Sequence, residues 1–398
     1  MRISKTTAAL WALGGACFVS VTSEYLPVAL LPQLSSDLGI SGSAIGLLVT
    51  WYAIVVAVSV VPLVAATARW ERRTTALVTV GALLVSNLLM AIASNYAVLV
   101  VARVVAAFGH GVFWSVVAAM AARLVGRAHA GRATAVVFAG NSLAFLLGLP
   151  LLSWLGSTIG WRPTVLATAA AAAVSAIAVR ASVGRLPAEQ PVAARRRSLL
   201  RSVIADRRLA AVNVVTALVV TGHFAAFTYI TVIIADYTHR TGSQTASVLL
   251  LHGAAGLLGL LLIGRTVDAY PRFTALIVTG GLAVCMLALL VVGPSSRALA
   301  MAAVVLWAVP VGGMAVVLQA AVLRVGADRD LASAVYIVAF QLGIALGAGI
   351  GGLGVSRDAL PVTIAIAAAC ALVAVPIVCR TAAFSATAEP SSPILEHR

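Results

Sequence analysis

The sequence is poor in charged residues. Asp, Glu, Lys and Arg together make up 10% of its 398 residues, whereas 62% are hydrophobic and the mean hydropathy is +1.07. A soluble protein of this size carries roughly a quarter charged residues. The shortage of charge therefore excludes a soluble protein and predicts an integral membrane protein.

Signatures of catalysis and of cofactor binding are also missing. The sequence has no G-x-x-x-x-G-K-[ST] phosphate-binding loop and no His, Cys or carboxylate cluster with metal-ligand spacing. Its 4 cysteines lie in or at the ends of apolar runs, which is typical of buried thiols. We therefore expect no enzymatic activity, no cofactor and no metal. The energy source is then an ion gradient, with protons favoured, or the substrate's own gradient.

Charges and turn residues divide the chain into twelve apolar segments, each long enough to cross a bilayer as a helix. The first follows a basic N-terminus and resembles a signal peptide, but we interpret it as an uncleaved span. The sequence predicts an all-α membrane protein of twelve transmembrane helices. The segments lie near 8–32, 44–68, 74–93, 97–122, 133–156, 162–180, 209–235, 244–264, 273–292, 298–323, 331–354 and 359–379.

The distribution of basic residues predicts the orientation. Most Lys and Arg residues fall in the loops on the side of the two termini, and the opposite loops hold only Arg162, Arg240, Arg297 and Arg357. Cytoplasmic loops carry this excess, so we expect cytoplasmic termini in a bacterial inner (plasma) membrane. We therefore interpret the net charge of +15 as a feature of loops that contact membrane lipid, and we expect no nucleic-acid partner.

The only long polar stretch divides the segments into two halves. We interpret 1–180 and 209–383 as six-helix bundles, 181–208 as a basic cytoplasmic linker and 384–398 as a short disordered cytoplasmic tail. Two six-span halves joined by a basic loop indicate a transporter that works by alternating access, here as a monomer.

The halves also repeat in sequence, at a spacing of about 200 residues. This spacing places Arg72 on Arg272 and Asn141 on Gln341. Glycines and alanines recur every fourth residue after both Asn141 and Gln341, and we expect these helices to pack closely and to form sliding surfaces between the halves.

Several stretches resemble the major facilitator superfamily, in particular the sugar-efflux (arabinose-efflux-like) group of its twelve-span drug/proton antiporter branch. They are Ser23–Val28 in the first segment, Arg103 to Phe113 in the fourth, and Gly160-Trp161-Arg162 before the sixth. The resemblance implies the fold of that superfamily. It also implies gating loop motifs, at Arg69, Arg72 and Arg73 in the first half and at Gly264, Asp268 and Arg272 in the second.

Glu24 and Arg103 are charges inside apolar segments, at similar depths from the outer surface. An intramembrane charge is costly and normally has a partner or a function. We therefore expect a proton-coupling pair, direct or through water, and the resemblance implies the same role for Arg103. The alternatives are that Glu24 lies in the headgroups and that Arg103 extends to the outer interface.

Further polar and aromatic residues share helix faces with these positions. His110 and Trp114 follow Arg103 on one face of the fourth segment, and His223 and Phe227 share a face of the seventh. With Asn141 and Gln341 they are the candidate substrate-binding residues. The alternative is that the histidines and amides bridge helices.

The sequence thus predicts a proton-coupled secondary transporter that exports small molecules. Sugars or related neutral solutes are the first substrate hypothesis, because few acidic residues are available to hold a cation. A drug or antibiotic exporter and a nucleoside exporter are alternatives on the same scaffold. A receptor or a membrane enzyme would need a signalling domain or a catalytic cluster.

Overall fold

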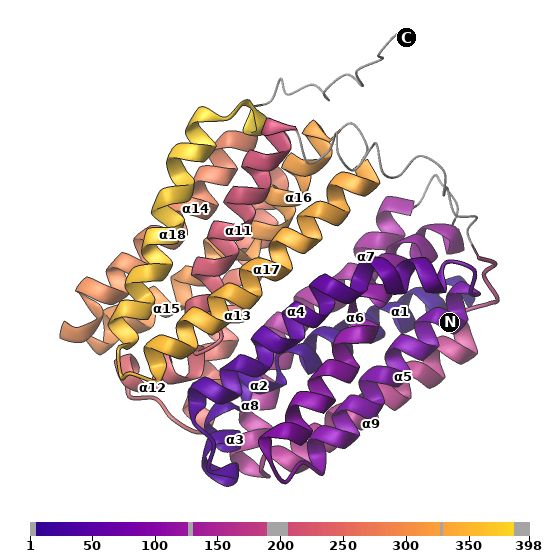
Figure 1. Cartoon of the computed structure of the whole chain (residues 1–398), viewed down its shortest axis with the longest axis horizontal. Coiled ribbons are helices and arrows are strands. Elements are labelled where there is room, and N and C mark those ends of the chain that lie inside the picture. Colours follow the sequence, from indigo (N-terminus) through magenta and orange to yellow (C-terminus); the bar gives the residue numbers. More distant parts are fainter. Residues whose placement is uncertain (1–4, 126–129, 189–205, 327–328, 386–398) are drawn as a thin grey trace. The chain divides into compact units, whose positions relative to one another are not determined.

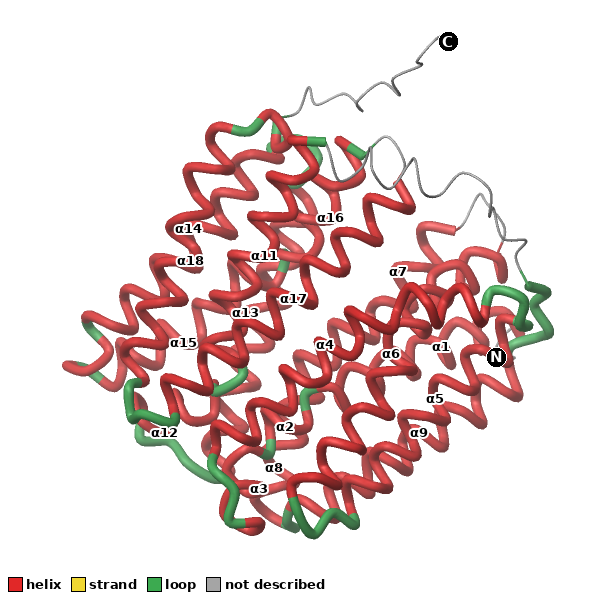
Figure 2. Tube along the Cα trace, in the orientation of Figure 1, coloured by secondary structure: helices red, strands yellow, loops and turns green. Residues whose placement is uncertain are grey.

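The computed structural model describes residues 5–125, 130–188, 206–326 and 329–385. The chain forms two compact units, each described here by itself. The first comprises Met1–Pro191 with Arg240–Leu250, and the second comprises Val192–His239 with Leu251–Arg398. The described residues contain helices and loops and no strand (Figure 2).

Twelve helical segments are long and apolar enough to cross a membrane, which confirms the predicted fold class (Figure 1). The predicted linker falls mostly in 189–205, and the predicted tail mostly in 386–398, both outside the described residues. The spans contain α1 (Lys5–Glu24), α4 (Gly42–Thr67), α5 (Arg72–Ala91), α6 (Tyr96–Val125), α7 (Ala130–Leu143) with α8 (Leu149–Thr158), α9 (Trp161–Ser182), α11 (Arg207–Phe227), α13 (Ser243–Thr266), α14 (Pro271–Val291), α15 (Arg297–Gly312) with α16 (Met314–Val325), α17 (Arg329–Val355) and α18 (Leu360–Arg380).

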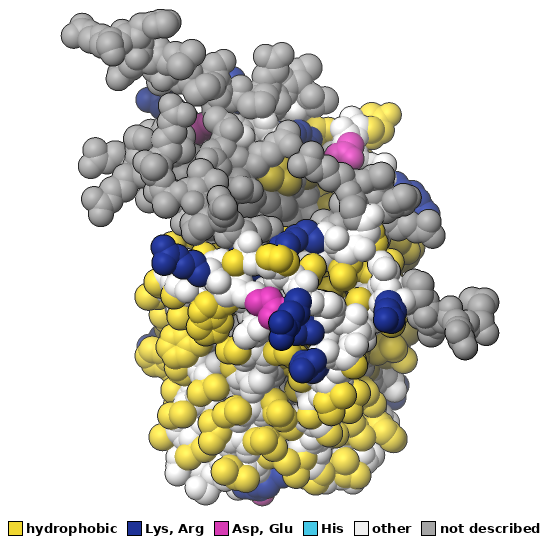
Figure 3. Space-filling view, turned by 90° about the vertical axis from the view of Figure 1, so that its right-hand side faces the viewer, with side chains coloured by type: hydrophobic (Ala, Val, Ile, Leu, Met, Phe, Trp, Pro, Cys, Tyr) yellow, Lys and Arg dark blue, Asp and Glu magenta, His cyan; other side chains and the backbone are white. Residues whose placement is uncertain are grey.

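Large hydrophobic side chains remain exposed on most spans, as expected where lipid replaces water. Trp11, Val58 and Ile177 are examples, at 62%, 73% and 68% exposure. On the face that Figure 3 shows, hydrophobic side chains cover the lower part, and Lys and Arg gather above them. This separation of apolar and basic surface is typical of a protein that crosses a membrane.

The first and seventh spans are broken helices. After α1 the chain continues as α2 (Leu26–Ala29) and α3 (Leu31–Leu38), with a break at Tyr25. Pro27 explains this break, because proline has no N–H to donate to the carbonyl four residues earlier. In the second unit α11 is followed by α12 (Ile230–Thr238), and the break at Tyr229 occurs without a proline. The two units therefore repeat the same interruption.

Glycines let the fifth span approach the first span of its own unit. A methyl group at Gly140 would collide with the backbone carbonyl of Gly14, and one at Gly148 would lie 2.5 Å from Oγ1 of Thr22. Close packing was predicted and is confirmed. The glycines themselves face the first span of their own unit, and the role of these helices as sliding surfaces between the halves stays a prediction.

The second unit repeats this packing between α17 and α11. A methyl group at Gly343 would lie 3.1 Å from the carbonyl oxygen of Ala217 and one at Gly351 would meet that of Ala225. Gly343 is thus the structural counterpart of Gly140. The predicted correspondence of Asn141 with Gln341 is therefore wrong, because Asn141 directly follows Gly140 whereas Gln341 precedes Gly343.

The loop arginines repeat as well, but in a different register from the predicted one. Nη1 of Arg73 donates to the carbonyl of Val183, directly after α9, at 3.3 Å. Nη2 of Arg272 donates to the carbonyl of Thr381, directly after α18, at 3.0 Å. Arg73 is therefore the counterpart of Arg272, and the predicted match with Arg72 is wrong. The reason is that α5 begins at Arg72, whereas α14 begins one residue before Arg272.

The other residues of the loop motifs have different environments. Arg72 is 8% exposed, and its backbone N–H donates to the carbonyl of Leu186 at 2.9 Å. Arg69, Gly264 and Asp268 are exposed. Their role in gating stays a prediction.

Candidate functional site

Glu24 is the last residue of α1, directly before the break at Tyr25. Its side chain is 13% exposed. Of the described residues in the twelve apolar spans, where the span formed by α17 starts at Ala332, Glu24 is the only acidic one. The break thus places one carboxyl group inside the first unit.

Arg103 on α6 is bound to this break through the backbone. Its Nη1 donates to the carbonyl of Ser23 at 2.9 Å, and its Nη2 donates to the carbonyl of Glu24 at 2.8 Å. Both carbonyls lack a helical partner, because the residue four positions after Ser23 is Pro27 and the N–H of Val28 donates to Tyr25 instead. Arg103 therefore caps the broken end of α1.

This arrangement corrects two expectations for Arg103. The side chain is 1% exposed, so it does not extend to the outer interface. Of the expected pair of Arg103 with the Glu24 side chain, the direct form is absent within the described chain, since the guanidinium donates to the backbone. A pair through water stays a prediction. The sequence shows the opposite charges of Glu24 and Arg103. It does not show that the carbonyls of Ser23 and Glu24 lack a helical partner.

His110 is the nearest basic group to the Glu24 carboxyl group. The distance from His110 Nε2 to Glu24 Oε2 is 3.9 Å, and the His110 side chain is 9% exposed. Its ring meets that of Tyr52 edge to face at 5.3 Å and that of Trp114 at 6.1 Å. The structure therefore brings His110 next to Glu24, and Trp114 contacts the His110 ring.

Tyr52 on α4 was missed by the sequence analysis. The Arg103 guanidinium carbon lies 4.3 Å from the centre of the Tyr52 ring, which is a cation–π contact. Asn87 on α5 was missed too, and its Oδ1 accepts a hydrogen bond from Ser23 Oγ at 2.7 Å. A single tyrosine or asparagine within an apolar span does not by itself indicate a functional site.

Asn141, which was predicted to bind substrate, is half-buried on α7. Within the described chain it forms no hydrogen bond to Tyr52, Asn87 or Arg103.

The second unit contains a separate cluster of rings on α11, α13 and α15. His223 stacks on Phe227 at 4.9 Å and 24°, and His252 stacks on Phe227 at 6.1 Å and 27°. Trp307 meets all three rings edge to face, at 5.3 to 6.3 Å. The predicted residues His223 and Phe227 thus lie together, with His252 and Trp307 beside them.

Hydrogen bonds define the proton positions on the two imidazoles. Trp307 Nε1 donates to His223 Nδ1 at 3.2 Å, so the neutral His223 ring carries its proton on Nε2. His252 Nδ1 lies 2.7 Å from the carbonyl oxygen of Val304 and must donate to it, which leaves His252 Nε2 as an acceptor. The cluster therefore offers one N–H donor and one nitrogen acceptor.

The bond from His252 to Val304 agrees with a helix-bridging role for that histidine. Gln341 on α17 is 6% exposed, and its Oε1 has no hydrogen-bond partner among the residues that the structure describes. Neither His252 nor Trp307 was expected at the site. The internal repeat of about 200 residues aligns Tyr52 with His252. The repeat could therefore have indicated that these two residues occupy equivalent positions in the two units.

The two clusters differ in charge. The first unit holds a carboxyl group, a guanidinium and an imidazole, whereas the ring cluster of the second unit holds neutral aromatic and imidazole rings. No group of three potential metal ligands occurs in the described part of the chain. The chemistry available is proton binding in one unit and ring stacking with hydrogen bonding in the other.

Twelve helices that are long and apolar enough to cross a membrane are the architecture of a polytopic membrane protein. The family model of the Major Facilitator Superfamily matches residues 13–348, and the chain belongs to that superfamily. Its members are transporters and not enzymes.

Similar proteins support this assignment. Chloramphenicol efflux pumps from two strains of Mycobacterium tuberculosis (ATCC 25618 / H37Rv and CDC 1551 / Oshkosh) are each 39% identical to this chain over 355 residues, which cover 87% of this chain and 85% of each relative. A crystal structure of a mutant of the nucleoside transporter NupG matches with a TM-score of 0.75 at 10% identity, over 95% of this chain and 100% of that one. The structural match confirms the fold.

Proposed function

We propose that this protein exports small, uncharged aromatic compounds of the chloramphenicol type in exchange for protons. The relatives that are 39% identical are chloramphenicol efflux pumps. The observation that carries the coupling is the position of Glu24, a lone acid at the broken end of the first span with Arg103 occupied by backbone carbonyls.

The coupling follows from the cost of a buried charge. A carboxylate inside the membrane needs a neutralising partner or a proton. The Arg103 guanidinium donates to two carbonyls and not to the carboxyl group, and we infer that a proton neutralises Glu24 when its surroundings are dry. Water that reaches the site in the other conformation favours release of that proton, so proton entry and substrate exit alternate.

The ring cluster of the second unit supports the substrate class. Chloramphenicol is neutral and combines an aromatic ring with hydroxyl and amide groups. Aromatic faces stack on such a ring, while the His223 N–H and the His252 nitrogen suit an acceptor and a donor on the substrate. An uncharged cluster also agrees with an uncharged substrate.

Sugars, which the motif resemblance favours, are not the substrate of the two relatives described above and serve as the comparison. Everted vesicles with an imposed pH gradient should accumulate labelled chloramphenicol. They should accumulate a pentose or a nucleoside only at background level.

Glu24→Gln should abolish gradient-driven accumulation but retain exchange of labelled for unlabelled chloramphenicol. If Glu24→Gln still concentrates substrate, Glu24 is not the coupling residue. Accumulation of the pentose alone would overturn the substrate class.

We also propose that the protein is a monomer in the plasma membrane of a bacterial cell, with both termini in the cytoplasm. The excess of basic residues on the side of the termini supports it. A reporter fused after Gln190 should be active as a cytoplasmic marker, and one fused after Thr241 as a periplasmic marker. Reversal of both signals would reverse the direction of transport.

A further inference from the structure

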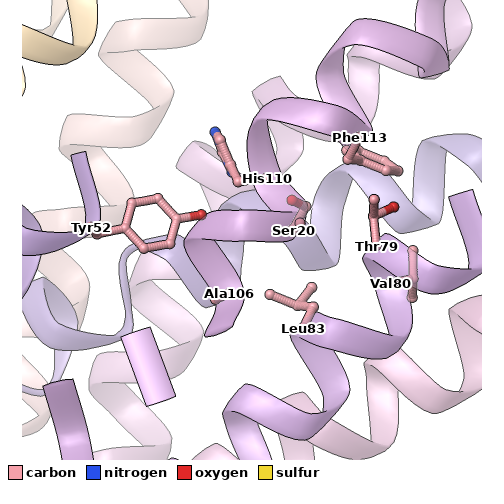
Figure 4. Close-up of a pocket in the computed structure, with 9 residues that line it drawn as sticks. Ser20, Tyr52, Thr79, Val80, Leu83, Ala106, His110 and Phe113 are labelled. Atoms are coloured by element: carbon pink, nitrogen blue, oxygen red, sulfur yellow. The ribbon is translucent and has the colours of Figure 1, made fainter. Parts of the chain in front are cut away.

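The intramembrane imidazoles of the two units differ in how firmly the protein fixes their protons. Figure 4 shows His110 near Tyr52 at a pocket of the first unit. Nδ1 of His110 is buried and has no partner among the described residues, so no hydrogen bond at this atom decides which nitrogen carries the proton. In the second unit, by contrast, α15 engages one ring nitrogen of both His223 and His252.

Trp307 fixes the proton of His223 strictly, because an indole N–H can only donate. Its Nε1 lies 3.2 Å from His223 Nδ1. A proton on that Nδ1 would place two N–H groups against each other, so this contact excludes both the Nδ1 tautomer and the doubly protonated ring. Trp307 is 0% exposed, and water therefore does not replace it as a partner. His223 is held as a neutral ring with its one N–H at Nε2.

The carbonyl of Val304 fixes His252 in the opposite sense, because a carbonyl can only accept. His252 Nδ1 donates to it at 2.7 Å, and Nε2 of the neutral ring is left as an acceptor. Val304 precedes Trp307 by three residues, or about one helical turn, on α15. One face of this helix thus sets the proton positions of both imidazoles.

The two Nε2 atoms are the free polar atoms of the ring cluster. Neither has a hydrogen-bond partner within the described chain, and neither is buried, although the rings of His223 and His252 are only 6% and 8% exposed. They lie on rings that contact Phe227 and Trp307. An aromatic substrate that packs against this edge therefore meets one fixed donor and one fixed acceptor.

We propose that Trp307 is a positioning residue for substrate selection. By keeping His223 a donor, it selects compounds that carry an acceptor-only group, such as the nitro group of chloramphenicol, on the stacked aromatic ring. The N–H groups of an aromatic amine would face the His223 N–H and stay unpaired. A polar group left unpaired in a dry site is costly, so the amine is rejected. This inference rests on chloramphenicol export, as proposed above.

Chloramphenicol and its analogue with the nitro group reduced to an amino group are the matched probes. In native protein the exchange KM of the amine should exceed that of chloramphenicol by at least about tenfold. Trp307→Phe keeps an aromatic ring but removes the N–H, so His223 can change tautomer and accept from the amine. The ratio of the two KM values should then fall to about threefold or less. Lost packing alone would raise both KM values and leave their ratio unchanged.

Two further proteins separate the N–H from the size of the side chain. Trp154→Phe, at a position 48% exposed on α8, is the matched control and should leave the ratio at its native value. Replacement of Trp307 by 3-benzothienylalanine, in which sulfur takes the place of the indole N–H, keeps the shape and should lower the ratio as Trp307→Phe does.

Nitrogen-15 NMR of histidine-labelled protein reads the proton position directly. Native His223 should be protonated at Nε2 and unprotonated at Nδ1, and both Trp307 variants should show a mixture of tautomers. Equal KM values for the two probes in native protein, an unchanged ratio in both Trp307 variants, or a proton on Nδ1 of native His223 would each overturn the inference. Failure of native protein to exchange chloramphenicol would instead overturn the proposed function, and the NMR spectrum would still test the role of Trp307.

Discussion

Replacement of Arg103 by methionine tests whether this side chain caps the broken end of the first span. Methionine keeps an unbranched, apolar side chain but removes the donors to the carbonyls of Ser23 and Glu24. A buried acceptor without a partner costs about 1–3 kcal/mol. Two such carbonyls predict a loss of about 2–6 kcal/mol in the stability of the first unit.

The assay is thermal unfolding of the purified protein in detergent, reported by a thiol-reactive fluorophore. Cys17 is fully buried in the core of the first unit and becomes reactive when that unit unfolds. The other three cysteines should be replaced by alanine to leave this single reporter. For a unit of this size 1 kcal/mol corresponds to about 2–4 °C, so Tm should fall by at least about 4 °C.

Arg123→Met is the matched control, because Nη1 of Arg123 also donates to one carbonyl, that of Pro187, but at the exposed surface of the same unit. Water can replace that donor, so the expected loss is about 1 kcal/mol or less.

Addition of Glu24→Gln to Arg103→Met separates the two possible partners of Arg103. If Arg103 mainly neutralises the carboxylate, the amide should restore stability; if it caps carbonyls, most of the loss should remain. An unchanged Tm in Arg103→Met would refute the capping role.

Two further predictions concern packing and pH. Gly140→Ala places a methyl group against the Gly14 carbonyl and should destabilise the first unit by about 1–3 kcal/mol in the same thermal assay, whereas Gly81→Ala, with nothing within 4 Å, should be neutral or slightly stabilising. Hydrogen bonds from Trp161 and Arg162 hold the pKa of the Asp37 carboxyl, outside the spans, below its ordinary value. This stabilisation is present at neutral pH and is lost as pH falls below about 4, so the Tm difference between native protein and Asp37→Asn should disappear at acidic pH. A difference that is independent of pH would contradict this linkage.

The number and type of the spans were predictable because each span is a long apolar run between charges and turns. The break at Pro27 was readable in principle, since a proline removes a donor at a known position. The break at Tyr229 was not, because no residue there forbids a helix. It is visible only in the backbone itself.

The candidate site was predictable in its charges but not in its contacts. Glu24 and Arg103 are conspicuous in apolar sequence, yet the partners of Arg103 are backbone carbonyls, and every residue has one. Tyr52 and Trp307 look like ordinary hydrophobic residues of a span. Only the packing of helices shows that they lie on Arg103 and on the two imidazoles of the second unit.

The difference in charge between the two clusters predicts that coupling and substrate affinity can be separated by mutation. Phe227 contacts the rings of both His223 and His252, and Phe227→Leu keeps an apolar side chain but removes the flat surface. One ring-on-ring contact is worth about 0.5–1.5 kcal/mol, so the exchange KM for chloramphenicol should rise about 2- to 10-fold. Phe273→Leu, at a position 61% exposed on the surface of α14, is the control and should leave KM unchanged. The number of protons moved per chloramphenicol should stay constant in Phe227→Leu, because Glu24 is in the other cluster. A changed stoichiometry, or an unchanged KM, would show that the ring cluster does not bind the substrate independently of the proton site.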